Sequence, residues 1–168
     1  PAQWEPLLPD LQRAGYATLN YASRSAQEID ETILARDVAG AVAALRRRRE
    51  IDPRRVGLVG ASIGGSAVAW TLGVQRSLPV RAGVGLSAVE GPAFIDAGAR
   101  GRLRPHDLLL IADRKEFSQA TNIRDDAHGR GVTTWMAPAS GHGVTLLSSA
   151  EVKHKLLAWL RRRLGERS

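Results

Sequence analysis

The sequence predicts an α/β fold in which helices cover both faces of a parallel sheet. Three observations lead to this prediction. Segments with helical periodicity alternate with short strand-like segments along the chain. The strand-like segments are continuous apolar runs rather than alternating patterns, which is typical of strands buried on both faces. The length of 168 residues fits one domain with a sizeable core.

The first quarter of the chain predicts a helix, a strand, a loop and a second helix. Residues 4–14 carry leucines at helical spacing, and Gly15 follows as a helix stop. Residues 16–21 read as a strand, and the polar residues 23–31 read as a loop. Residues 32–50 show the clearest apolar stripe of a surface helix.

The middle of the chain predicts a strand, a sharp turn and a short buried helix. The strand covers residues 56–59, and small apolar residues at 66–72 form a helix that Gly73 closes. A further strand with glycines is predicted over residues 80–89. Residues 90–105 are rich in Gly, Pro and Arg and are predicted to be irregular.

The last third continues the alternation of strands and helices. A buried strand is predicted within residues 107–112 and a helix over residues 117–129. A last short strand follows at 132–136, and an amphipathic helix at 151–164 ends the domain. Since consecutive strands are separated by helices, we expect them to lie parallel in one sheet.

The composition narrows the possible functions. The chain has 24 basic and 17 acidic residues, a formal charge of +7, and no cysteine. The absence of cysteine excludes a disulfide, a thiolate nucleophile and a cysteine metal site. The arginine runs at 46–49 and 161–163 end predicted helices, where cations complement the helix dipole. Nucleic-acid binding is therefore not predicted, and no apolar run reaches membrane-spanning length. The cytoplasm is favoured, although the location stays open.

The stretch Val-Gly-Leu-Val-Gly-Ala-Ser-Ile-Gly-Gly at residues 56–65 carries a candidate nucleophile. Ser62 lies between the end of a strand and the start of a helix. This turn predicts a positive φ at Ser62, with Gly60 and Gly64 on either side because bulky side chains would collide there. The helix would direct its first amide, that of Ile63, at an oxyanion beside Ser62.

A nucleophilic serine needs a base, and His142 is the best-placed histidine. It lies in a glycine-flanked loop directly after the last predicted strand, at the sheet edge where Ser62 is expected. His106 precedes a strand at the opposite edge, and His128 and His154 are predicted to lie on the surface. We therefore expect His142 to act as the base.

The base in turn needs an acid, and two residues after the strand 107–112 qualify. Asp113 follows the strand almost directly, whereas Glu116 lies three residues further and is better spaced to reach the His142 loop. The spacing favours Glu116, and Asp113 remains the alternative. Asp125 and Asp126 are predicted to be solvated helix residues.

These residues resemble the α/β-hydrolase superfamily, in its small serine-esterase and dienelactone-hydrolase-like branch. The order of nucleophile, acid and histidine is that of the family, and residues 15–21, 37–55, 141–143 and 157–160 resemble its segments. The resemblance implies an α/β-hydrolase fold, which is a three-layer sandwich with a mostly parallel sheet. It also implies a serine hydrolase that cleaves small carboxylic esters through an acyl-enzyme and needs no metal or organic cofactor.

The chain departs from the family at three points. Its acid turn reads Asp113-Arg114-Lys115-Glu116, where the family commonly has Gly-x-x-Asp, and this alignment matches Glu116 to the acid. Dienelactone hydrolases proper use a cysteine nucleophile, so a serine esterase is the nearer match. The resemblance further implies a central strand, carrying the second oxyanion donor, in native sequence that precedes Pro1.

Two other functions stay open at this point. The unusual acid turn and the expected missing strand also fit a non-catalytic hydrolase-like domain that acts by binding. The positive charge fits a basic module for an acidic partner, which would show steeply salt-dependent binding. The oligomeric state and the identity of the ester are not predicted by the sequence.

Overall fold

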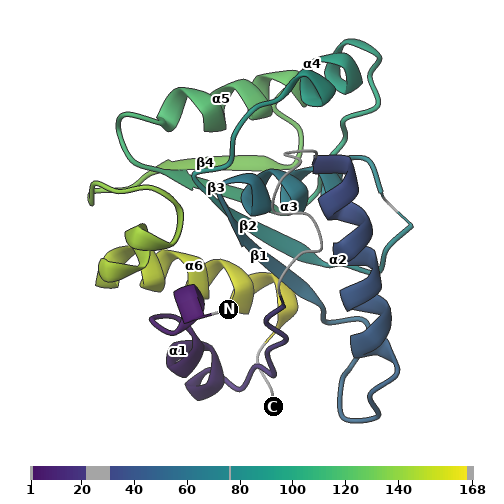
Figure 1. The fold of residues 1–168 in the computed structure, drawn as a ribbon, viewed down its shortest axis with the longest axis vertical. Helices are drawn as coiled ribbons and strands as arrows, with labels where there is room; N and C mark the ends of the chain where they lie inside the picture. The colour runs from purple at the N-terminus through teal and green to yellow at the C-terminus, as the bar shows by residue number, and fades with distance from the viewer. Residues whose placement is uncertain (1, 22–30, 76, 166–168) are drawn as a thin grey trace.

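The computed structural model describes residues 2–21, 31–75 and 77–165. Its centre is a parallel sheet of four strands in the order β1-β2-β3-β4. These strands are β1 (Gly57–Ala61), β2 (Ala82–Leu86), β3 (Leu108–Ala112) and β4 (Val132–Met136). Each connection between neighbouring strands contains a helix, as Figure 1 shows. The predicted α/β class with a parallel sheet is therefore confirmed.

Helices cover both faces of the sheet and create two separate apolar cores. One face carries α2 (Glu31–Arg46), α3 (Ile63–Gly73), α4 (Pro92–Ala99) and α5 (Phe117–Asp126). The other carries η1 (Ala2–Trp4), α1 (Leu8–Arg13), η2 (Gly143–Ser148) and α6 (Ala150–Leu164). Leu108 and Leu110 of β3 point into the first core, and Leu109 and Ile111 point into the second. All five residues of β3 are buried, which is why its sequence is apolar without alternation.

The parallel register brings the carboxyl ends of the strands to one edge. Ala61 at the end of β1 pairs with Leu86 of β2, and Ala112 of β3 pairs with Met136 of β4. The segments that follow the strands therefore start side by side. This edge is where ligands bind in open parallel sheets.

Residues 16–21 form no strand, contrary to the prediction, and β1 is an edge strand within the described part of the chain. An apolar groove with a volume of about 440 Å³ separates the two segments. Residues 15–21, α1, α2 and all of β1 line it. A strand needs a hydrogen-bonded neighbour, and the groove keeps 16–21 away from the edge of β1.

Residues 90–105 contain α4, which the prediction of irregular structure missed. Pro92 suits the first turn of a helix because its missing N–H needs no partner there. Phe94 is fully buried and makes an edge-to-face contact with Trp70 of α3, with ring centroids 5.5 Å apart. Tertiary packing thus stabilises a helix that the Gly-rich sequence around it does not indicate.

Smaller differences concern the ends of elements. The helix predicted to reach residue 50 ends at Arg46, so Arg47 to Arg49 lie beyond it. Most of the predicted loop at 23–31 falls outside the described residues, and the helix predicted at 117–129 ends at Asp126. The 3-10 helix η2 was not predicted, whereas β4 has the predicted bounds.

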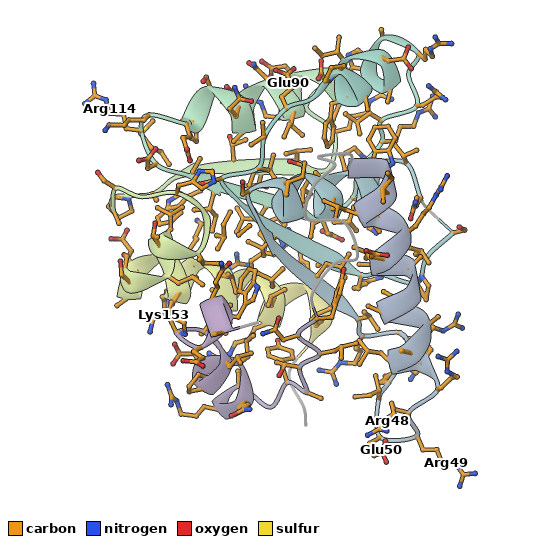
Figure 2. All side chains as sticks on the ribbon, viewed as in Figure 1. Arg48, Arg49, Glu50, Glu90, Arg114 and Lys153 are labelled. Atoms are coloured by element: carbon orange, nitrogen blue, oxygen red, sulfur yellow. The ribbon has the colours of Figure 1, made fainter. Side chains whose placement is uncertain are left out.

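The arginine run after α2 lies far from the carboxyl edge of the sheet. Figure 2 shows Arg48 and Arg49 at the opposite end of the molecule from Arg114, which belongs to the turn after β3. In the described ranges, no helix is both long enough and apolar enough to cross a membrane.

Candidate active site

Ser62 occupies the sharp turn between β1 and α3. Its backbone has φ +54° and ψ −127°, so the predicted positive φ is confirmed. A non-glycine residue rarely adopts this conformation unless its surroundings impose it. The Ser62 amide donates a hydrogen bond of 2.8 Å to the carbonyl of Leu86, which ties the turn to the end of β2. The hydroxyl is left free of any cap bond to α3.

Gly60 and Gly64 differ in their need to be glycine. A Cβ atom on Gly60 would lie 2.1 Å from the carbonyl oxygen of Gly64, which is backbone and cannot move aside. A Cβ atom on Gly64 would meet no atom within 4 Å. The predicted collision therefore arises at Gly60, and the expectation for Gly64 is corrected. The turn is tight because the backbone of α3 passes directly over the end of β1.

The helix α3 begins at Ile63, directly after the serine. The first amides of a helix have no carbonyl partner within the helix, and the helix dipole makes this end positive. The Ile63 amide therefore belongs to the positive end of α3 and is next to Ser62 in the chain.

His142 and Glu116 are in direct contact although 26 residues separate them. His142 Nδ1 lies 2.7 Å from Glu116 Oε1. Glu116 follows β3 and precedes α5, and His142 follows β4 and precedes η2. The two side chains meet because β3 and β4 are parallel neighbours. The second oxygen of Glu116 is buried and has no hydrogen-bond partner among the described residues.

The histidine loop also reaches the turn of Ser62. Gly143, the neighbour of His142, packs against the end of β1: a Cβ atom on it would lie 3.4 Å from Ala61 Cβ and 3.8 Å from the Ser62 amide nitrogen. Its φ of +57° suits glycine. The backbone of the loop therefore passes beside the backbone of Ser62, and Ser62, Glu116 and His142 all follow strands at the carboxyl edge of the sheet.

Asp113, the alternative acid, makes different contacts. Its carboxylate is buried and accepts hydrogen bonds from the amides of Gly141 (3.2 Å), Glu116 (3.0 Å) and Lys115 (2.9 Å). The Gly141 bond, followed by those of Glu116 and Lys115, lowers the pKa of Asp113 below its ordinary value. Asp113 thus joins the acid turn to the histidine loop, and the side chain that faces the imidazole is that of Glu116.

We expect the two acids to respond differently to neutralisation. Glu116→Gln should lower kcat on a short acyl ester by about 100- to 10,000-fold, because the amide no longer orients the imidazole or stabilises its charge. Its urea midpoint should stay close to that of the wild type. Steady-state kinetics and urea titration measure the two effects. Full activity in Glu116→Gln would contradict the assignment of the acid.

Asp113→Asn is the matched variant, and it should lower the free energy of unfolding. Because the pKa of Asp113 is depressed in the folded state, its carboxylate stabilises the fold above the unfolded pKa of about 4. That stability is lost as the pH falls through the folded pKa. The free energy of unfolding should therefore drop in Asp113→Asn at about pH 7, and the difference from the wild type should shrink toward about pH 2. A difference independent of pH would contradict this account.

The remaining histidines lie apart from the site. His106 Nε2 lies 3.0 Å from the carbonyl of Val80, before β2 and β3 begin, and His128 and His154 are exposed. Asp125 pairs with Arg124 on the surface, as expected for a solvated residue. Asp126 is half-buried rather than solvated, and burial, then its hydrogen bond to Glu90, raises its pKa to about 6.

The sequence analysis missed two buried serines near the site. Ser87 follows β2, and its hydroxyl accepts a 2.9 Å hydrogen bond from the Gly143 amide. Ser66 of α3 bonds both the amide and the carbonyl of Val89. Ser87 fell inside a strand predicted to continue to residue 89, so its position after the strand was hidden. In the described part of the chain, no three His, Asp or Glu side chains could hold a metal ion together.

Comparisons with known proteins find solved structures with the same fold. No family model and no curated protein sequence matches the chain. An esterase from Pyrococcus furiosus superimposes with a TM-score of 0.73 at 19% identity, over 96% of this chain and 76% of the esterase. A CIB-like hydrolase from Thermoplasma acidophilum gives 0.65 at 17% identity, over 96% and 80%. A dienelactone hydrolase from Anabaena variabilis gives 0.64 at 19% identity, over 82% and 63%. With its parallel sheet between two helical layers, the chain has an α/β-hydrolase fold.

Proposed function

We propose that the protein is a serine hydrolase that cleaves carboxylic esters through an acyl-enzyme. The observation that carries the proposal is the contact between His142 and Glu116 beside a serine with positive φ. A nucleophile, a base and an acid that orients the base form the arrangement used for acyl transfer. The hydrolase neighbours support this reading at the level of the fold.

The reaction would proceed in two steps. Ser62 Oγ attacks the carbonyl carbon while His142 Nε2 takes its proton, and His142 then gives that proton to the leaving alcohol. Glu116 accepts a hydrogen bond from Nδ1 and stabilises the imidazolium. In the second step water attacks the acyl-enzyme, its proton passes through His142 back to Ser62, and the acid is released. The residues need no metal or organic cofactor for these steps.

The Ile63 amide would hold the oxyanion together with a second donor. We propose that this donor belongs to a strand in native sequence preceding Pro1, and that the strand fills the groove beside β1. The groove supports this idea because it runs along all of β1 and reaches Ile63 and Gly64. Losing one oxyanion donor costs on the order of 100- to 1000-fold in turnover. Residues 1–168 alone should therefore turn over slowly.

Two measurements test the proposed strand. Intact mass and N-terminal sequencing of the natural protein should reveal residues before Pro1. Adding them should protect the β1 amides from hydrogen exchange and raise kcat by about 100-fold or more. A natural protein that starts at Pro1 would refute this proposal and leave the proposed triad to be judged separately.

Labelling with a fluorophosphonate tests the proposed function itself. The probe should form an adduct on Ser62, located by peptide mass spectrometry, in a protein extended upstream of Pro1. Ser62→Ala should give no adduct, and His142→Ala should slow labelling by at least about 100-fold. Ser148→Ala, an exposed serine in η2, is the control and should label normally. A folded wild-type protein without an adduct would favour the non-catalytic binding domain.

A further inference from the structure

Ser87 has an unusual backbone for a buried serine. It follows β2 directly, is 2% exposed and adopts φ +48°. Glycine, asparagine or aspartate would occupy this left-handed conformation more easily than serine. Such a backbone persists only where the surroundings of the residue impose it. The Ser87 hydroxyl accepts the buried hydrogen bond of 2.9 Å from the amide of Gly143.

Ser87 is fixed from both sides. Its own amide donates a 2.7 Å hydrogen bond to the carbonyl of Ile111, at the end of β3. Two residues later, Val89 is bound to α3, since Ser66 Oγ lies 2.9 Å from its amide nitrogen and 2.8 Å from its carbonyl oxygen. Ser66 is itself fully buried. The Ser87 hydroxyl, which accepts the bond from the Gly143 amide, is therefore held at a defined position relative to α3, the helix that follows Ser62.

The hydrogen bond between the Gly143 amide and the Ser87 hydroxyl restrains the backbone directly after His142. The side chain of His142 is 54% exposed, so packing does little to hold it. Several contacts orient this part of the chain: Glu116 binds the imidazole, Asp113 accepts a hydrogen bond from the Gly141 amide, and Thr145 donates to the His142 carbonyl. Ser87 adds the bond to the following amide and ties it to the end of β2. Gly143 itself lies close to Ala61 and to the Ser62 amide, so the bond to Ser87 acts on the part of the loop nearest the serine.

We propose that Ser87 is a positioning residue that holds the His142 loop in register with Ser62. The inference rests on the proposed function, because it assigns Ser87 a part in presenting the base. Ser87 does not touch the reacting atoms and acts through Gly143. A displacement of about 1 Å in a catalytic group can cost about 100-fold in rate. Without the hydroxyl, the Gly143 amide would lose its acceptor, and the loop would keep the Glu116 contact, the Asp113 bond and the Thr145 bonds but no bond to the end of β2.

The test compares Ser87→Gly and Ser87→Ala with Ser148→Ala. Ser87→Gly removes the whole CH2OH side chain but relieves the positive φ, so it should remain folded, whereas Ser87→Ala removes only the hydroxyl and keeps the strained backbone. The control, Ser148→Ala, removes an exposed hydroxyl that bonds the Thr145 carbonyl in the same loop. With p-nitrophenyl acetate, kcat should fall about 10- to 100-fold in both Ser87 variants, with KM within about twofold. Ser148→Ala should keep the wild-type values.

A second readout does not depend on turnover. Hydrogen exchange at the Gly143 amide, followed by NMR, should become at least about tenfold faster in Ser87→Gly, and the imidazole resonances of His142 should change position at a fixed pH. If both stay as in the wild type, the positioning role is wrong, whatever the activity. If they change while wild-type Ser62 never reacts with the fluorophosphonate, the positioning role holds and the proposed hydrolysis fails. A folded Ser87→Gly variant with full kcat would also overturn the role.

Discussion

Replacing Ser62 or His142 by alanine is expected to reduce kcat on short acyl esters by a factor on the order of 10,000 or more. Ser62 supplies the only proposed nucleophile, and alanine leaves the acyl transfer to water. His142 is the proposed base, and without its imidazole Glu116 Oε1 would lose the ring nitrogen that it meets. The measurement is steady-state hydrolysis of p-nitrophenyl acetate by the extended protein, with active-site titration of each preparation.

A double variant tests whether Ser62 and His142 act as one unit. Residues that work as one unit lose activity together, so Ser62→Ala combined with His142→Ala should be about as inactive as either single variant. His154→Ala, which changes an exposed histidine of α6, is the matched control and should retain the wild-type rate. Multiplicative losses in the double variant would show that the two side chains act independently and would contradict the triad.

Gly60→Ala is expected to destabilise the fold by about 3 kcal/mol or to prevent folding, which is the upper end of the usual cost of overpacking. The added Cβ would lie 2.1 Å from the Gly64 carbonyl oxygen and 2.9 Å from the Gly65 nitrogen. Both atoms belong to the first turn of α3, so relief requires the helix to move away from β1. Urea unfolding followed by circular dichroism measures the effect.

Gly64→Ala is the matched control, four residues away in the same turn. A Cβ atom there meets open space, and alanine is the better helix former. Its free energy of unfolding should equal that of the wild type or exceed it by up to about 1 kcal/mol. Equal losses in the two variants would mean that the close backbone approach at Gly60 is not what makes glycine necessary.

The main elements and the edge of the sheet that carries the site could be predicted from local pattern. Buried parallel strands are apolar without alternation, and helices are recognised by apolar residues that recur every three or four positions. Once the strands are parallel, residues that follow them must share an edge, so Ser62, Glu116 and His142 could be brought together without coordinates. The positive φ at Ser62 followed from the same strand-to-helix turn.

Other features depended on long-range contacts and escaped prediction. Residues 16–21 have the composition of a strand but lie across a groove from β1, and strand formation needs a pairing neighbour as well as propensity. The helix α4 is stabilised by the burial of Phe94 against Trp70. The local sequence pattern does not predict this contact. In both cases tertiary context overrode local preference.

The sequence by itself determined the fold class and the chain order of the proposed nucleophile, acid and base, because chain order and hydrophobic pattern are local properties. Only the tertiary structure decided how the two acids differ. Asp113 and Glu116 belong to one turn, yet one carboxylate binds backbone amides and the other meets the imidazole. Only the structure revealed Ser87, since its bond to Gly143 joins residues 56 positions apart. Such contacts arise from the packing of distant segments, and that packing exists only once the chain has folded.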